Sequence, residues 1–372
     1  MGDRGGEGAR SAAGATSSRR ERDPRFRGAE IHGGEPRSAE EGLVYRDMVA
    51  IGASAGGVEA LRELMSGLPP DLRAAVLVVL HLPATGRSVL PAILARAGPL
   101  PATVPADGQP LERAHVYVAP PDRHLLVMGE RMRLTAGPRE NGHRPAIDPL
   151  FRSVARAYGP RAVAVVLSGN LDDGAAGARL VKNRGGGVLV QDPDDTLYPE
   201  MPISAAAVTD VDACLPAAEL AARLCELLEE PVRDRGEEEL EERESRETED
   251  LAEAERAVNG RPTELACPEC GGPLLERDEG PLVRFACRVG HVFSPDSLMA
   301  EHGKELERAL WSALRSLEER ADLYRRMARR AGNRPAVHRR FVGRSEAAEE
   351  HADALRDAIA KLTGSDGLER AS

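Results

Sequence analysis

The chain has 372 residues, 41% of them hydrophobic, which is enough for two or three domains with a sizeable core. Its formal net charge is −11, but 14 acidic and five basic residues between positions 229 and 256 account for −9 of it. The rest is nearly neutral, so nucleic-acid binding is not expected. There is no run of about 18 apolar residues and no secretory signal, so we expect a cytoplasmic protein without membrane insertion.

Residues 1–44 lack hydrophobic periodicity and predict a disordered N-terminal tail. Between 45 and 228, short apolar runs alternate with amphipathic stretches of helical spacing. The runs are 48–51, 75–80, 115–118, 125–128, 162–167 and 187–190. Near-continuous valine and leucine runs separated by helices predict an α/β fold, a doubly wound and mostly parallel sheet with helices on both faces.

The first of these runs breaks into a glycine-rich turn with Ser54 at its apex. Glycines two positions before and after the serine allow a tight strand-to-helix turn, from which the hydroxyl projects as a nucleophile. A phosphate-binding turn and a purely structural turn are the alternatives. A dinucleotide-binding fingerprint is disfavoured because it would need glycine at position 54.

Two further polar positions follow strand ends, at His81 and at the pair Asp172 and Asp173. The carboxyl ends of parallel strands share one edge of the sheet, so these side chains could meet Ser54 there. A serine hydroxyl needs an imidazole within about 3 Å to take its proton, and the imidazole needs a carboxylate to orient it. The structural alternatives are a strand-capping role for His81 and helix N-capping by one of the aspartates.

Several spaced motifs between about 47 and 228 occur in a distinctive order. They are Gly-Ala-Ser-Ala-Gly-Gly from position 52, His-Leu-Pro from 81, Tyr-Val-Ala-Pro-Pro-Asp-Arg-His from 117, Arg-Pro-Ala-Ile-Asp from 144, Ser-Gly-Asn-Leu-Asp-Asp-Gly from 168, Gln-Asp-Pro from 191 and Met-Pro from 201. Together they resemble the catalytic domain of the chemotaxis methylesterase CheB. The order serine, histidine, aspartate also differs from that of α/β-hydrolases.

That family removes methyl groups from glutamate methyl esters on chemoreceptors, and some members deamidate glutamines. The resemblance implies that Ser54 is the nucleophile, His81 the general base and then acid, and Asp173 the orienting carboxylate. Asp173 matches better than Asp172 because the family's aspartate directly precedes glycine. No cofactor is implied for catalysis. The implied partner is a methylated chemoreceptor or a related signalling protein.

The resemblance also implies that the backbone amides of Ala55 and Asn170 stabilise the oxyanion. Asn170 and Leu171 stand where the family has methionine and glycine. The family's enzymes usually carry a receiver domain ahead of the esterase, and 44 residues are too few for one, so we expect no phosphorylation control within this chain. The alternatives are a non-catalytic regulatory or scaffolding protein that keeps the fold as a binding module, and an esterase of small molecules.

The acidic segment 229–262 predicts a solvated linker or exposed helix. A helical stripe at 297–330 and a second helix at about 335–362 predict a C-terminal helical hairpin within 297–372, for which recruitment of a protein partner is the hypothesis.

Between linker and hairpin, two close pairs of metal-ligand residues are separated by 16 intervening residues. This spacing predicts a zinc ribbon over 263–296 with a structural, non-catalytic Zn²⁺. Its four ligands would be Cys267, Cys270, Cys287 and His291. The odd cysteine number argues against a disulfide framework, and Cys214 and Cys225 are predicted core thiols.

Overall fold

The computed structural model describes residues 43–82, 88–233 and 260–369, with side chains to 362. The expected tail 1–44 and linker 229–262 therefore lie largely outside the described residues. At their inner ends the structure differs from expectation, because β1 (Leu43–Tyr45) pairs antiparallel with β11 (Pro231–Arg233). In this pairing the backbone N–H and C=O groups of the two segments bond to each other. In a fully solvated tail and linker they would bond to water instead.

A seven-stranded sheet forms the centre of the N-terminal half, in the order β10-β9-β8-β2-β3-β5-β4. Every neighbouring pair is parallel, so the prediction of a mostly parallel α/β sheet is confirmed. The strands are β2 (Met48–Ala53), β3 (Ala75–Leu80), β4 (Ala102–Thr103), β5 (His115–Val118), β8 (Ala162–Val166), β9 (Gly187–Gln191) and β10 (Ala213–Leu215). Strands β2, β3, β8 and β9 are buried throughout, as expected for a sheet covered on both faces.

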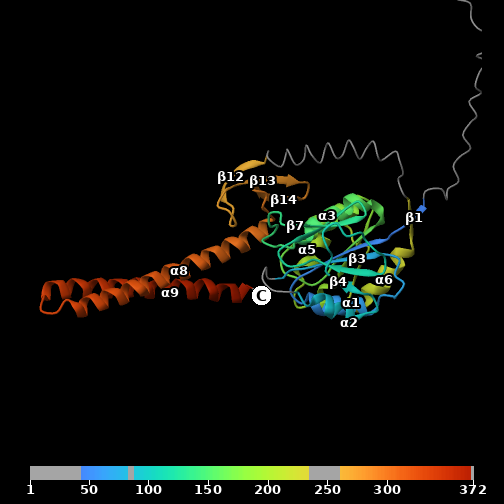
Figure 1. Ribbon diagram of the computed structural model, residues 1–372. Helices are drawn as coiled ribbons and strands as arrows, with labels where there is room; N and C mark the ends of the chain where they lie inside the picture. Colours follow the sequence, from blue (N-terminus) through green and yellow to red (C-terminus); the bar gives the residue numbers. More distant parts are fainter. Residues whose placement is uncertain (1–42, 83–87, 234–259, 370–372) are drawn as a thin grey trace, which may run out of the picture. The chain divides into compact units, whose positions relative to one another are not determined.

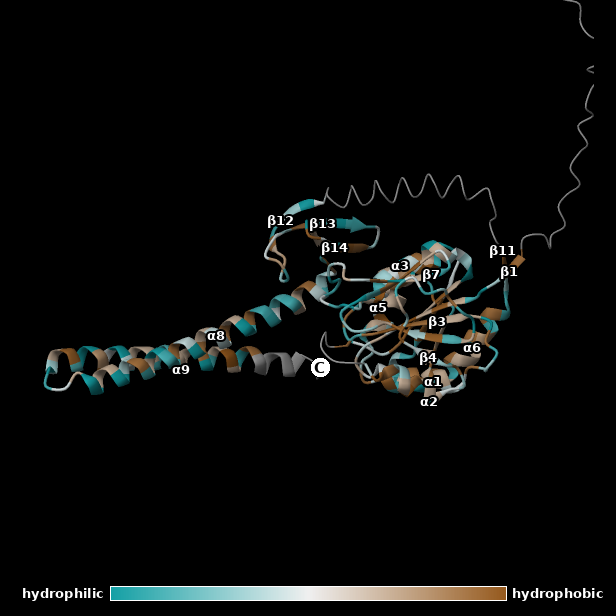
Figure 2. Cartoon of the chain, viewed as in Figure 1, coloured by the Kyte–Doolittle hydropathy of each residue, from teal (hydrophilic) through white to brown (hydrophobic). Residues whose placement is uncertain are grey.

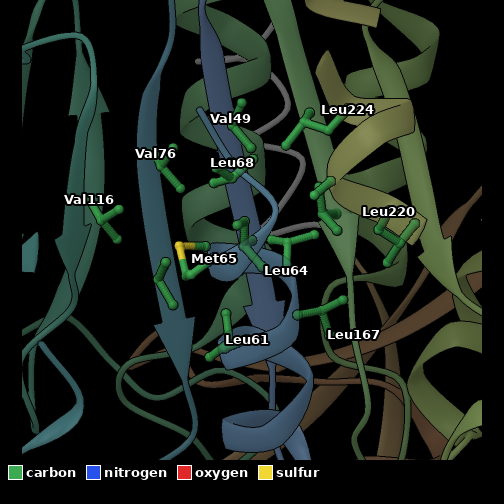
Figure 3. Close-up of a cluster of buried hydrophobic side chains, with 14 of the residues drawn as sticks. Val49, Leu61, Leu64, Met65, Leu68, Val76, Val116, Leu167, Leu220 and Leu224 are labelled. Atoms are coloured by element: carbon green, nitrogen blue, oxygen red, sulfur yellow. The ribbon is translucent and has the colours of Figure 1, made fainter. Parts of the chain in front are cut away.

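Alternate residues of each central strand enter two separate hydrophobic cores, since successive strand side chains point to opposite faces. Val49 and Ile51 pack with α1 (Gly57–Ser66), α2 (Leu90–Ala97) and α6 (Ala217–Glu229). Figure 3 shows part of this core, with Leu61 and Leu224 converging on the sheet. Met48 and Ala50 point to the other face, which is covered by α3 (Ile147–Tyr158), α4 (Ala175–Asn183) and α5 (Glu200–Val208). Short 3₁₀ turns occur at Gly159–Arg161 and Pro193–Asp195.

The apolar run 125–128 does not join the parallel sheet, contrary to expectation. It forms β6 (His124–Met128), which pairs antiparallel with β7 (Arg131–Thr135) as a separate two-stranded hairpin. The two strands are joined by only Gly129 and Glu130, with Gly129 at φ 59°. A two-residue connection can only return antiparallel, because a parallel partner would need a crossover of a dozen or more residues.

The C-terminal part contains a small antiparallel sheet of order β12-β13-β14-β15, called here the small sheet (residues 261–293). Its strands are β12 (Arg261–Ala266), β13 (Pro273–Glu279), β14 (Leu282–Cys287) and β15 (Val292–Phe293). Two long helices follow, α8 (Pro295–Arg330) and α9 (Pro335–Glu369), labelled in Figure 1. Leu314, Ala352 and Ile359 form the buried contact between them.

Hydropathy differs between the two halves (Figure 2): α8 and α9 alternate hydrophilic and hydrophobic residues, whereas the central strands such as β3 are hydrophobic. Among the described residues, no helix is both long and apolar enough to cross a membrane.

Candidate functional site

Ser54 lies in the turn between β2 and α1, half-buried, at the carboxyl end of the central strand. Its backbone N–H donates to the Ser168 carbonyl oxygen at 2.8 Å, which joins this turn to the loop after β8. Gly56 has φ 71°, and a Cβ there would lie 2.7 Å from the Ser168 hydroxyl. Glycine therefore allows the tight turn that presents Ser54 at the sheet edge.

The structure brings Ser54, His81 and Asp173 into one line of hydrogen bonds. The His81 Nδ1 lies 3.1 Å from the Ser54 hydroxyl, and the His81 Nε2 lies 2.8 Å from Asp173 Oδ2. The side chains of His81 and Asp173 are only 6% and 2% exposed. All three residues follow strand ends, so the convergence results directly from the shared edge of parallel strands.

The protonation pattern of this line follows from its donors and acceptors. An ionised carboxylate can only accept, so Nε2 of His81 carries the proton toward Asp173 and Nδ1 accepts from the Ser54 hydroxyl. Burial by itself would raise the pKa of Asp173, but the hydrogen bond and charge of His81 and the Ile147 amide outweigh it. The pKa of Asp173 is therefore held below its ordinary value, and the carboxylate stays ionised.

The amides of Ala55 and Asn170, expected as oxyanion donors, flank this site from two loops. Neither N–H has a hydrogen-bond acceptor within the described part of the chain, whereas the neighbouring amides of Ser54 and Gly169 are already engaged. Gly169 approaches so closely that a Cβ on it would lie 2.7 Å from Ser54 Cβ. Both free donors thus belong to turns adjoining Ser54.

Sequence reasoning missed two residues that contact the triad, Asn141 and His143. The rings of His143 and His81 stack with centroids 3.6 Å apart and planes 8° from parallel. Asn141 Nδ2 donates to Asp173 Oδ1 at 3.0 Å. Both residues precede the motif at 144–148, whose Ile147 amide donates to Asp173 at 2.7 Å. Their position just before this motif was the signal in the sequence that could have identified them as site residues.

The expected helix-capping role of Asp172 or Asp173 is wrong. The cap of α4 comes from Asp148 on α3, whose Oδ1 accepts from the amides of Gly174 at 3.1 Å and Gly177 at 2.8 Å. Asp173 is turned toward His81, and Asp172 accepts from the Ser294 hydroxyl at 2.6 Å. Local spacing suggested a cap, but a carboxylate from another helix occupies that position.

The four predicted metal ligands converge at the edge of the small sheet, with their ligand atoms all within 4.8 Å of one another. Cys270 and Cys287 Sγ are 3.6 Å apart, and His291 Nδ1 lies 3.7 Å from Cys267 Sγ and 3.5 Å from Cys287 Sγ. Zinc bonds of about 2.3 Å to sulfur and about 2.0 Å to nitrogen separate tetrahedral ligands by about 3.5 to 3.8 Å. The donor set therefore fits a zinc ion.

Cys214 and Cys225, predicted as core thiols, lie apart from this cluster. Cys225 on α6 is partly buried against the core, but Cys214 is exposed. The prediction for Cys214 is wrong because β10 is an edge strand of the large sheet.

The fold and the site define a doubly wound α/β protein with a Ser–His–Asp cluster at the carboxyl ends of its strands. Residues 49–224 match the model of the CheB methylesterase family. The chain therefore contains a CheB methylesterase domain.

Curated relatives carry the name protein-glutamate methylesterase/protein-glutamine glutaminase. One from Myxococcus xanthus is 45% identical over 156 residues, covering 42% of this chain and 44% of the relative. One from Anaeromyxobacter dehalogenans is 43% identical over 179 residues, covering 48% and 52%. The chain thus spans about half the length of the curated relatives it matches. The crystal structure of the Thermotoga maritima CheB methylesterase catalytic domain is 31% identical, covers 50% of this chain and 100% of that chain, and has a TM-score of 0.47.

Proposed function

We propose that residues 45–228 form a serine esterase that hydrolyses glutamate methyl esters on a signalling protein of the chemoreceptor type. The observation that carries this proposal is the buried hydrogen-bonded line from Ser54 through His81 to Asp173. The names of the relatives, which specify glutamate methylesterase and glutamine glutaminase, support the choice of substrate.

In the proposed reaction His81 Nδ1 takes the proton of the Ser54 hydroxyl as its oxygen attacks the ester carbonyl. The amides of Ala55 and Asn170 donate to the developing oxyanion. Protonated His81 then gives the proton to the departing methoxide, which leaves as methanol, and an acyl-enzyme remains on Ser54. Water, deprotonated by His81, attacks the acyl carbon of that ester. His81 then returns the proton to the departing Ser54 oxygen, and the released carboxyl group ionises to glutamate. With a glutamine side chain the leaving group is ammonia.

Asp173 supports both steps without itself taking the proton. Its ionised carboxylate fixes the ring of His81 with Nδ1 toward Ser54 and stabilises the imidazolium that forms. The low pKa of Asp173 supports this role.

We further propose that residues 263–296 form a zinc ribbon. Cys267, Cys270, Cys287 and His291 would hold one Zn²⁺. Four protein ligands leave no open coordination position, so the ion would stabilise the small sheet and take no part in hydrolysis.

The decisive experiment compares Ser54→Ala with wild type in methanol release from a carboxyl-methylated receptor fragment. Loss of the nucleophile is expected to lower turnover by about three orders of magnitude or more. Labelling by a serine-reactive fluorophosphonate should be lost in parallel. Ser66→Ala, an exposed serine at the end of α1, is the matched control and should behave as wild type.

Two results would contradict the proposal. Retention of methanol release or of labelling by Ser54→Ala would exclude the nucleophile role. A wild-type protein that binds the receptor fragment but neither labels nor releases methanol would instead be a binding module with the esterase fold.

A further inference from the structure

A buried asparagine joins the triad to the small sheet. Asn141 is 1% exposed and lies between β7 and α3. Its Nδ2 donates to Asp173 Oδ1 at 3.0 Å and approaches Asp148 Oδ2 at 3.4 Å. Its Oδ1 accepts from Arg284 Nη1 at 3.2 Å and from the Ser294 amide at 3.0 Å. One side-chain amide therefore contacts the triad carboxylate and the small sheet together.

The orientation of this amide is determined by the charges around it. Carboxylates only accept, whereas the Arg284 guanidinium and the Ser294 amide only donate. The reverse orientation would place oxygen against the carboxylates and NH₂ against two donors. Arg284 and Ser294 therefore select the orientation of Asn141 in which its NH₂ group faces Asp173.

Arg284, which orients Asn141, is itself held in place by a buried ion pair. It lies on β14, is 4% exposed, and forms a buried ion pair with Asp148 on α3. Burial alone would lower the pKa of this guanidinium, but Asp148 raises it, so the pair stays charged. The Asp148 backbone amide in turn donates to Asp173 Oδ1 at 3.2 Å. Arg284 thus supports Asp173 through Asn141 and through Asp148.

The beginning of α8, directly after the small sheet, makes a second connection to the same turn. The Ser294 hydroxyl donates to Asp172 Oδ1 at 2.6 Å, and the Ser297 hydroxyl does so at 3.2 Å. Asp172 directly precedes the triad aspartate. The turn carrying Asp173 is therefore held by side chains from the beginning of α8.

We propose that the small sheet and the N-cap of α8 that follows it position the catalytic carboxylate of the esterase: Arg284 and Ser294 fix Asn141, and Asn141 fixes Asp173. This inference rests on the proposed function, because it takes Asp173 as the triad acid. Arg284 and Asn141 are positioning residues, since neither touches the reacting atoms. The predicted metal ligands Cys287 and His291 flank the turn between β14 and β15. Because Arg284 lies in β14 and Ser294 directly follows β15, ordering of this turn would also order these two residues.

The test measures the rate constant at which a fluorophosphonate labels Ser54 in the full chain, together with the fraction of molecules finally labelled. Asn141→Gly removes the amide while tolerating the local φ of 51°, and it leaves the Arg284–Asp148 pair in place. We expect its rate constant to fall by about ten-fold to one-hundred-fold, the magnitude known for losing an outer hydrogen bond that orients a metal-ligating side chain. The plateau of labelling should stay near that of wild type.

Two substitutions of Arg284 extend the test. Arg284→Met removes both contacts of the guanidinium, whereas in Arg284→Lys a single ammonium can replace only one of them at a time. The labelling rate constants should therefore rank wild type, Arg284→Lys, Arg284→Met in falling order. Such graded rescue is not expected of a residue that only supports folding.

Matched controls separate positioning from general damage. Ala114→Gly places glycine at another positive φ of the N-terminal half, at 54°, and Arg261→Met removes an exposed arginine from the small sheet. Both should label at the wild-type rate. A wild-type rate constant in Asn141→Gly, or a lower plateau with an unchanged rate constant in all the Asn141 and Arg284 variants, would overturn the inference.

The outcome is distinguishable from failure of the proposed function. If Ser54→Ala labels like wild type, the esterase proposal fails. If wild type labels at Ser54 and the Asn141 and Arg284 variants do so equally fast, only the positioning role fails.

Discussion

Stacking of His143 on His81 places a second imidazole against the proposed general base. The two rings are 3.6 Å apart and nearly parallel, so His143 limits rotation of His81 away from Ser54. A charged ring would be repelled here whenever His81 becomes an imidazolium. Burial, and then the charge of His81, lower the pKa of His143 to about 3, which keeps the ring neutral near pH 7.

This neutral histidine predicts a specific acid sensitivity of stability. Below the unfolded pKa of about 6.5, the unfolded chain takes up a proton at His143 that the folded chain, with its pKa of about 3, does not. The unfolding free energy therefore keeps its full value above pH 6.5 as far as His143 is concerned. As the pH falls below 6.5, this group lowers the unfolding free energy by at most about 1.4 kcal/mol per pH unit. His143→Phe keeps a flat ring and should show a shallower loss of unfolding free energy between pH 6.5 and 4 in urea titrations. His351→Phe, at an exposed histidine, is the control and should follow the wild-type dependence of unfolding free energy on pH. If the curves of unfolding free energy against pH were parallel for wild type and His143→Phe, the lowered pKa of His143 would be contradicted.

At the scale of elements, the loop after β8 and the turn after β2 behave as one unit. Ser54 N–H donates to the Ser168 carbonyl, and the Ser168 hydroxyl donates to the Ala55 carbonyl at 2.6 Å. Gly169 donates to the Tyr198 carbonyl at 2.9 Å, which extends the unit to the loop before α5. Three strand-end segments therefore determine together where the Ser54 hydroxyl stands.

Gly169→Ala tests this close packing. A methyl group there would collide with Met201 Sδ and lie 2.7 Å from Ser54 Cβ. We expect overpacking to cost about 1–3 kcal/mol of unfolding free energy. Displacement of Ser54 should slow fluorophosphonate labelling by about ten-fold or more, since catalytic geometry tolerates little misplacement. Gly137→Ala, where the nearest atom is 3.7 Å away, should change neither, and equal effects of the two substitutions would refute the argument.

At the scale of the whole molecule, the small sheet contains few large apolar side chains of its own. Its core consists of Leu274, Phe293 and the two buried cysteines, together with Leu298 from α8. So small a core seldom supports a stable fold without a metal or a disulfide. We therefore expect metal binding and folding of the small sheet to be inseparable.

Metal analysis of the purified chain should find about one equivalent of zinc, because four ligands form one tetrahedral site. Cys270→Ser should lose most of it, whereas Cys225→Ser, on α6 and outside the cluster, should retain it. Chelation should also slow labelling of Ser54 about as much as Asn141→Gly does, since both disconnect the small sheet from Asp173. Less than about half an equivalent in the intact chain would rule the zinc site out.

Local patterns were sufficient to predict the parallel sheet and to propose the catalytic and metal-binding residues. The strand-end positions of Ser54 and His81 predicted their meeting because parallel strands place their carboxyl ends at one edge. The pattern did not predict that β6 lies outside the parallel sheet, because an apolar run of that length is compatible with either a parallel sheet or a hairpin. It also misassigned the cap of α4, which Asp148 supplies from another helix.

The amino-acid sequence by itself determined which side chains stand at strand ends and which cysteines stand close enough to share a metal, since both follow from spacing along the chain. Only the tertiary structure decided what surrounds Asp173. Arg284 reaches Asp148 across 136 positions, and the two sit on different elements. Contacts of this kind depend on how elements pack, and no periodicity or motif within one element encodes the side chain that another will present.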